Sequence, residues 1–164
     1  MVNIQNVSST ESKRLIREFL RERSSGVLAS ADAAGNPHAA VVYFVPEDGY
    51  TILFATKRET QKYKNIEANN NVAFAIYDEV LQIAIQIMGH VEVVQEESLR
   101  ESVLSSMVEK SASISGRETP PPDKLSSGDY AILRLFPLVI KMSIFARSDY
   151  DGDDIYETIL FNPS

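Results

Sequence analysis

Alternation of apolar residues with small or polar ones over residues 81–94 constrains the fold of this chain more than any other feature. Every second position at the start of this run is apolar: Leu81, Ile83, Ile85 and Ile87. Such alternation is typical of a β-strand with one face in a core. Gly89, inside the run, predicts a β-bulge or a close approach of a second backbone.

Clusters of Gly, Pro, Asn and Asp separate further short apolar runs, which is the pattern of a β-meander. The predicted strands are residues 27–31, 38–45, 50–55, 72–77, 81–94, 129–136 and 138–145. The run 72–77 is apolar on both faces and is therefore expected in the centre of the sheet. Pro137 is expected to interrupt the last two strands.

Apolar residues at helical spacing predict helices over residues 10–23, 61–68 and 96–108. Gly26 is expected to end the first of them. Residues 111–127 carry three consecutive prolines and are expected to form an exposed loop. These elements predict a mainly β fold, a six- to seven-stranded antiparallel β-barrel with flanking helices.

Size and charge bound the domain organisation and the partners. The chain has 164 residues, and we expect one domain over residues 1–146 with a C-terminal tail over 147–164. A formal net charge of −7 disfavours nucleic acid and anionic membranes as partners. The sequence has no cysteine and no recognisable signal peptide or membrane span, so we expect a cytoplasmic protein.

No metal site is expected. The two histidines, His38 and His90, are not spaced as a zinc-binding pair. The acidic segment 149–154 has only a superficial likeness to a calcium loop, because Gly152 stands at its fourth position and Leu160 at its twelfth. We expect that segment to be an acidic surface turn.

A cationic stretch with two hydroxyl groups connects the predicted strand 50–55 to the predicted helix 61–68. Its threonines and cationic residues are Thr56, Thr60, Lys57, Arg58, Lys62 and Lys64. The first turn of a helix has unpaired N–H donors and attracts anions, and cations add charge-assisted hydrogen bonds. Together these groups suit a phosphate monoester. The alternative is a solvated loop whose lysines serve solubility.

Two further features suit a flat heterocycle. The backbone of the predicted strand 38–45 offers hydrogen-bonding groups to a ring, and the small Ala39 and Ala40 allow a ring to approach. Gln82 and Gln86 lie on the face of their strand that carries no isoleucine. A carboxamide donates and accepts hydrogen bonds and so suits the pyrimidine edge of a flavin. The alternative for residues 38–45 is that they form an ordinary core strand. The alternative for the two glutamines is that they lie on a solvent-exposed outer face.

Several short motifs stand in an order that resembles one known superfamily. They are Gly26–Ser30, Gly35–His38, Tyr43–Phe44, Leu53–Thr56, Thr60–Lys62, Asn65–Ile66, Asn70–Val72 and Gly89–Glu92. In this order they resemble the pyridoxamine 5'-phosphate oxidase-like, FMN-binding split β-barrel superfamily. The resemblance covers residues 15–94.

The resemblance implies a homodimer with FMN at the subunit interface. The residues that would lie along or contact the flavin ring are His38, Val41, Val42, Tyr43, Ala55 and Thr56. In this family a glutamine of the partner chain often reaches the ring. Gln86 is the candidate for that role, and Gln82 is the alternative.

The same resemblance assigns the phosphate of FMN to Thr60, Gln61 and Lys62. Gln61 stands where the oxidases have an arginine. Lys57 or Arg58 is therefore expected to contribute to phosphate binding as well.

The departures from the family pattern bear on the reaction. The chain has no tryptophan, and its segment 141–147 does not match the arginine- and histidine-bearing end of the true oxidases. The sequence is more similar to the general stress protein and flavin reductase-like branches. We therefore predict an FMN-dependent oxidoreductase of unknown substrate, with no residue named as catalytic. The alternatives are a non-enzymatic flavin-binding or sensing protein and a relative that binds F420 or heme.

Overall fold

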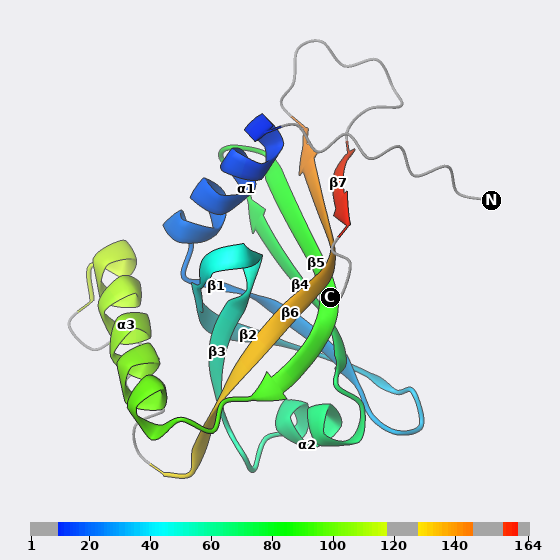
Figure 1. Ribbon diagram of the computed structural model, residues 1–164, viewed down its shortest axis with the longest axis vertical. Helices are drawn as coiled ribbons and strands as arrows, with labels where there is room; N and C mark the ends of the chain where they lie inside the picture. Colours follow the sequence, from blue (N-terminus) through cyan, green and yellow to red (C-terminus); the bar gives the residue numbers. More distant parts are fainter. Residues whose placement is uncertain (1–9, 118–127, 146–155, 161–164) are drawn as a thin grey trace.

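The computed structural model describes residues 10–117, 128–145 and 156–160 (Figure 1). The elements in chain order are α1 (Thr10–Glu22), β1 (Ser25–Ala31), β2 (Pro37–Pro46), a short 3-10 helix η1 (Asp48–Tyr50), β3 (Ile52–Lys57), α2 (Gln61–Ala68), β4 (Asn71–Asp78), β5 (Ile83–Val93), α3 (Glu97–Ser115), β6 (Tyr130–Ile144) and β7 (Tyr156–Leu160). The predicted helices and strands are present with shifted ends, except that the last two predicted strands form the single strand β6.

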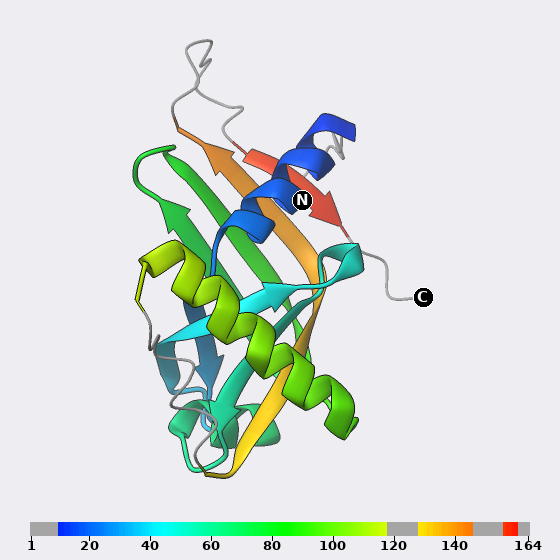
Figure 2. The ribbon, with the colours of Figure 1, turned by 90° about the vertical axis from the view of Figure 1, so that its left-hand side faces the viewer.

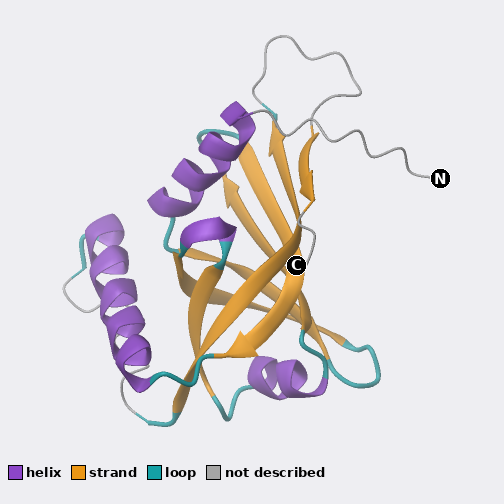
Figure 3. Cartoon of the chain, viewed as in Figure 1, coloured by secondary structure: helices purple, strands orange, loops and turns teal. Residues whose placement is uncertain are grey.

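The strands form one antiparallel sheet in the order β3-β2-β1-β4-β5-β6-β7 (Figure 3). An additional pairing of β3 with β6 closes the first six strands into a barrel, and β7 adds to the edge of β6. The predicted fold class, a mainly β antiparallel barrel with flanking helices, is confirmed. The expected central position of residues 72–77 is also confirmed, because β4 lies between β1 and β5.

The barrel is not evenly closed. β3 pairs with β6 along its whole length, from Ile52 to Lys57. It pairs with β2 only from Phe44 to Pro46, opposite Ile52 to Phe54. Residues 37–43 of β2 therefore pair with β1 on one side, and within the described chain no strand pairs with their other edge.

The predicted bulge at Gly89 is confirmed. The register between β5 and β6 shifts between Met88 and Gly89, and a Cβ atom at Gly89 would lie 2.0 Å from the carbonyl oxygen of Phe136. Gly89 faces Pro137 across the ladder. Because a bulge locally disrupts ladder hydrogen bonding, β6 accommodates this proline without a break. The prediction of two separate strands at this point is wrong.

Three other expectations are corrected. Gly26 lies inside β1, where a Cβ atom would meet the ring of Phe74 at 2.4 Å, so it does not end α1. Gln82 has a φ of 52° and precedes β5, which begins at Ile83. Helix α3 continues through Ser115 into residues expected to be loop. The remaining predicted loop, 118–127, and the acidic segment 149–154 lie outside the described residues, and the domain end at residue 146 stays a prediction.

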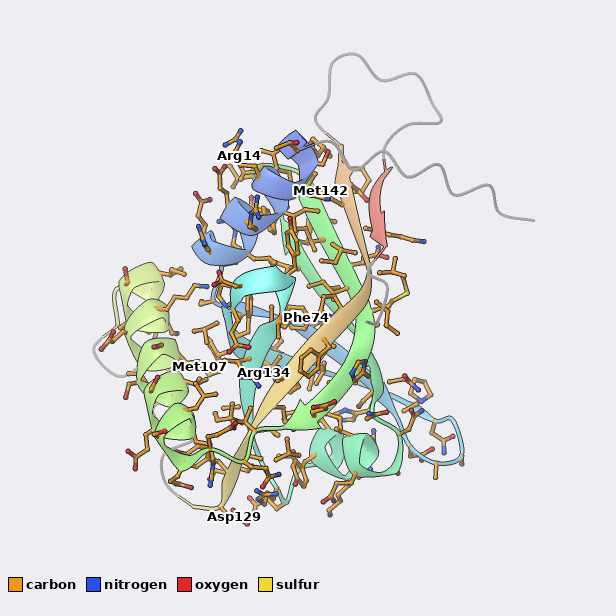
Figure 4. All side chains as sticks on the ribbon, in the orientation of Figure 1. Arg14, Phe74, Met107, Asp129, Arg134 and Met142 are labelled. Carbon is orange, nitrogen blue, oxygen red and sulfur yellow. The ribbon has the colours of Figure 1, made fainter. Side chains whose placement is uncertain are left out.

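The core fills the barrel and the space beneath two helices. Phe44 and Phe74 are fully buried and meet edge to face, with ring centroids 5.3 Å apart. Ile16 and Leu20 of α1 and Met107 of α3 join this core (Figure 4). Both helices lie on one side of the barrel, in front of the strands in Figure 2.

Lys110 of α3 joins the two helices to the barrel. Its Nζ atom donates to the carbonyl oxygen of Leu20 at 3.1 Å and lies 4.9 Å from the ring centroid of Phe44. Burial lowers the pKa of Lys110 from 10.5 to about 8.

This pKa shift predicts how stability changes with pH. Between pH 8 and 10.5 the unfolded chain holds the Lys110 proton more tightly than the folded chain, so the free energy of unfolding rises with pH. We expect wild type to gain stability relative to Lys110→Met across this window, and to gain none below it. Urea unfolding of both proteins at a series of pH values measures the difference, and parallel pH curves would contradict the assignment.

Candidate functional site

Two hydroxyl groups converge where β3 passes into α2. The Oγ1 atoms of Thr56 and Thr60 are 2.9 Å apart, and Thr60 Oγ1 also donates to the carbonyl oxygen of Lys57 at 2.8 Å. Thr60 precedes α2 with an extended backbone, and its side chain makes no capping bond to the helix. The N–H groups of the first turn of α2 therefore do not donate to the Thr60 side chain, and an anion can accept their hydrogen bonds instead.

The cationic residues of this turn differ in how they are engaged. Lys62, in the first turn of α2, is partly buried, and burial lowers its pKa. Arg58 is held by its own chain, because its guanidinium bonds to Asp129 at 3.2 Å and to the hydroxyl group of Tyr63. Figure 4 shows Asp129 at the lower end of the molecule. Of these two cations, Lys62 is the better placed to meet an added anion.

A polar chain fixes α2 against β1. Gln61 Nε2 donates to Asn65 Oδ1 at 2.8 Å, and Asn65 Nδ2 donates to Ser30 Oγ at 3.2 Å. Asn65 and Ser30 are both buried. His38 is the cross-strand neighbour of Ser30, and its Nδ1 atom is buried without a hydrogen-bond partner among the described residues. An unpaired buried acceptor or donor is costly, so this atom is open to a ligand or water.

The predicted ring-contacting residues lie along the edges where β2 and β3 part. Val42 and Ala55 are buried, so their side chains belong to the core and only their backbones are open to a ring. Val41 points outward and is 65% exposed, and Tyr43 is half-buried. The edge of β2 before Phe44 keeps backbone hydrogen-bonding groups that no described strand uses.

The two glutamines lie elsewhere on the molecule. Gln86 is exposed on β5 and lines a groove of about 470 Å³ together with Val27, Ala75, Tyr77 and Phe145, among others. None of the described residues of the Thr56–Lys62 turn lines this groove. Gln82 is exposed in the connection before β5. Within one chain, the structure thus brings together residues 56–62 but does not bring either glutamine to them.

A second, charged cleft of about 580 Å³ lies between α1, η1 and β6, lined by Arg21, Glu47, Arg134 and Phe136, among others. Arg134 bonds to both carboxylate oxygens of Glu47, at 2.8 and 3.0 Å. These bonds raise the pKa of Arg134. Its guanidinium is therefore already satisfied within the chain.

Sequence reasoning missed the partners of the predicted residues. Asp129 is 71 residues from Arg58, and Ser30 is 35 residues from Asn65. A local sequence pattern therefore cannot predict the Arg58–Asp129 or the Asn65–Ser30 hydrogen bond. It also missed that the outer face of β1, β2, β4 and β5 is apolar and exposed, notably at Val41 and Tyr77. The run 72–77 has small or apolar residues on both of its faces, and this pattern could have predicted an apolar outer face of the sheet.

A comparison with protein families identifies the family of this chain. The family model described as pyridoxamine 5'-phosphate oxidase matches residues 12–141. The chain belongs to the pyridoxamine 5'-phosphate oxidase family. No match to it is found among curated proteins.

Solved structures with the same fold include proteins with different cofactors in their names. General Stress Protein 26 from Bacillus anthracis is 21% identical, with a TM-score of 0.62 over 81% of this chain and 94% of that one. HutZ, the heme storage protein from Vibrio cholerae, is 24% identical, with a TM-score of 0.60 over 76% and 89%. A pyridoxamine 5'-phosphate oxidase-related, FMN binding protein from Nostoc punctiforme is 12% identical, with a TM-score of 0.59 over 98% and 100%. At these identities the likeness establishes the fold alone.

No described helix is long and apolar enough to cross a membrane. No group of three or more His, Cys, Asp or Glu side chains in the described part of the chain is arranged to hold a metal ion.

The polar chain beneath α2 generates a stability prediction. Asn65→Ala should lower the free energy of unfolding by about 1–3 kcal/mol, because it leaves the buried Ser30 hydroxyl without its partner. Gln61→Ala, which removes the exposed member of the same chain, should change it by less than about 0.5 kcal/mol. Urea unfolding of the two variants measures both values, and equal losses would refute the role given to Asn65.

Proposed function

We propose that this family member binds FMN at the turn between β3 and α2 and acts as an FMN-dependent oxidoreductase. The observation that carries the proposal is the convergence of the Thr56 and Thr60 hydroxyl groups, 2.9 Å apart, at the start of α2. To donate to a phosphate group on this turn, the two hydroxyl groups would rotate away from each other and from the carbonyl oxygen of Lys57. The first N–H groups of the helix and the ammonium group of Lys62 would add further donors.

The residues present fit FMN. Thr56, Thr60 and Lys62 would hold the phosphate, with Gln61 kept in place by its bond to Asn65. The edge of β2 that no described strand pairs with would hydrogen-bond the ring through its backbone. The Nδ1 atom of His38, which has no hydrogen-bond partner among the described residues, belongs to the same strand. Bound FMN supplies hydride and electron transfer, while the protein supplies position and electrostatics.

A second copy of the chain is part of the proposal. The outer face of the sheet exposes large apolar side chains, with Val41 at 65% and Tyr77 at 59%. Exposed apolar patches of this kind mark interaction surfaces. A homodimer formed through this face would bury them and would bring Gln86 of one chain towards the ring bound by the other. Gln86 lines a groove that none of residues 56–62 lines, which supports a role for it at the ring bound by a second chain.

Heme is the competing cofactor, because the heme storage protein HutZ shares the fold. The hydroxyl and ammonium groups of the turn favour a phosphate-bearing cofactor over heme. The absorption spectrum of the loaded protein separates the candidates. A flavin spectrum that NAD(P)H bleaches supports an enzyme, a flavin that resists reductants supports a sensing role, and a Soret band supports heme.

Lys62→Glu tests the phosphate site. The change removes a cation and adds a negative charge beside the phosphate, so FMN affinity should fall by about tenfold or more, which is about 1.4 kcal/mol. Lys64→Glu makes the same charge change at an exposed position of the same helix and should alter FMN affinity by less than about threefold. Fluorescence titration with FMN measures both, with circular dichroism to verify folding. Equal affinities in the two variants would remove Lys62 from the site.

A further inference from the structure

Arg58 lies between the two threonines of the proposed phosphate turn, yet its side chain is bonded to a residue outside that turn. Its Nε atom donates to Oδ1 of Asp129 at 3.2 Å. Its guanidinium group also bonds to the hydroxyl group of the buried Tyr63, and its Cζ atom lies 5.2 Å from the centroid of that ring. Because Tyr63 belongs to the first turn of α2, the guanidinium is kept beside the helix start at which we propose that the phosphate binds.

The ion pair of Arg58 with Asp129 is a weak one. It has a single hydrogen bond, and the two side chains are 36% and 76% exposed. Arg134, by contrast, bonds to both carboxylate oxygens of Glu47 in a pair whose side chains are 26% and 29% exposed. Bidentate pairs are the stronger kind, and exposed pairs contribute little to stability. The guanidinium of Arg58 can therefore exchange the Asp129 carboxylate for another anion at low cost.

The backbone keeps residue 129 beside the turn whichever anion holds the guanidinium. The N–H group of Arg58 donates to the carbonyl oxygen of Asp129 at 3.2 Å, and the next pair along, Lys57 with Tyr130, belongs to the ladder of β3 and β6. In Figure 4 Asp129 lies at the end of the molecule that also carries α2. Separation of the two side chains thus needs only side-chain rotation, and the carboxylate stays near the site.

We propose that the Asp129 carboxylate competes with the FMN phosphate for the guanidinium group of Arg58. A phosphate monoester carries about −1.5 to −2 charges at neutral pH and has three acceptor oxygens, so it is the stronger partner. Arginine has five N–H donors, which allows the guanidinium to keep its bond to Tyr63 while it turns to the phosphate. Asp129 therefore lowers the affinity for FMN and makes the bound cofactor easier to release.

This inference rests on the proposed function, because it gives the same phosphate site a control on its affinity. Asp129 is a positioning residue, since it acts through Arg58 and does not touch FMN. A merely structural tether would have the opposite effect. Breaking such a tether would loosen the turn and weaken FMN binding, whereas removal of a competitor strengthens it.

Asp129→Asn tests the sign of the effect, because it removes the charge and keeps the size of the side chain. The affinity for FMN should rise by about threefold or more. Riboflavin has the same ring without the phosphate, and its affinity should stay within about twofold of the wild-type value. Fluorescence titration with the two flavins measures both affinities. A fall in FMN affinity, or an equal rise for FMN and riboflavin, would overturn the proposal.

A double-mutant cycle with Arg58→Gln shows whether the gain passes through the guanidinium. In the Arg58→Gln protein, the further change Asp129→Asn should alter FMN affinity by less than about twofold, because the carboxylate then has no guanidinium to hold. Glu67→Gln makes the same charge change at an exposed position of α2 and should leave FMN affinity within about twofold. A full gain without Arg58, or an equal gain in Glu67→Gln, would also overturn the proposal.

Asp129→Ala is a second variant, because an asparagine at this position can still accept a hydrogen bond from Arg58. It should raise FMN affinity at least as much as Asp129→Asn, and circular dichroism verifies that both proteins are folded. Wild-type FMN affinity in both variants rejects the competition alone and leaves the FMN site in place. Failure of FMN to bind the wild-type protein rejects the proposed function and this inference with it.

Discussion

Unequal pairing of β3 with its two neighbours is the constraint on which the rest of this molecule depends. β3 pairs with β6 from Ile52 to Lys57 but with β2 only as far as the Phe44–Phe54 pair. Closure by β6 makes a barrel with a continuous core, while the early parting of β2 leaves an edge unpaired beside the Thr56–Lys62 turn. Hydrogen-bonding groups of a backbone edge and two converging hydroxyl groups thus come to lie on the same split, which is where we propose that FMN binds.

The apolar outer face follows from the same sheet. Alternation along β4 buries Phe74 and leaves Ala73 and Ala75 outward, so the strand is apolar on both faces although only one faces the barrel core. A single chain leaves that outer face in water. In the proposed homodimer a second copy would cover this outer face, which would explain why the face is apolar. The same arrangement would place Gln86 of one chain at the site of the other.

Local patterns in the sequence were enough for the elements and for one special position. Alternation from Ile83 to Ile87 predicts β5, and a glycine within it predicts the bulge that the structure has at Gly89. Local patterns failed where a distant partner decides. Pro137 does not break β6 because β6 itself has a bulge beside it, at Leu138, opposite Gly89. Arg58 is engaged by Asp129, which lies 71 residues along the chain. The sequence was enough to predict the residues of the candidate turn. It was not enough to predict that Arg58 is engaged within the chain while Lys62 is placed to meet a ligand.

A crystal structure of the protein soaked in FMN tests the central claim most directly. The account predicts the phosphate within hydrogen-bond distance of the Thr56 and Thr60 hydroxyl groups and near Lys62, with the ring along the edge of β2. A turn left vacant at saturating FMN, or a flavin bound with its phosphate elsewhere, would contradict it.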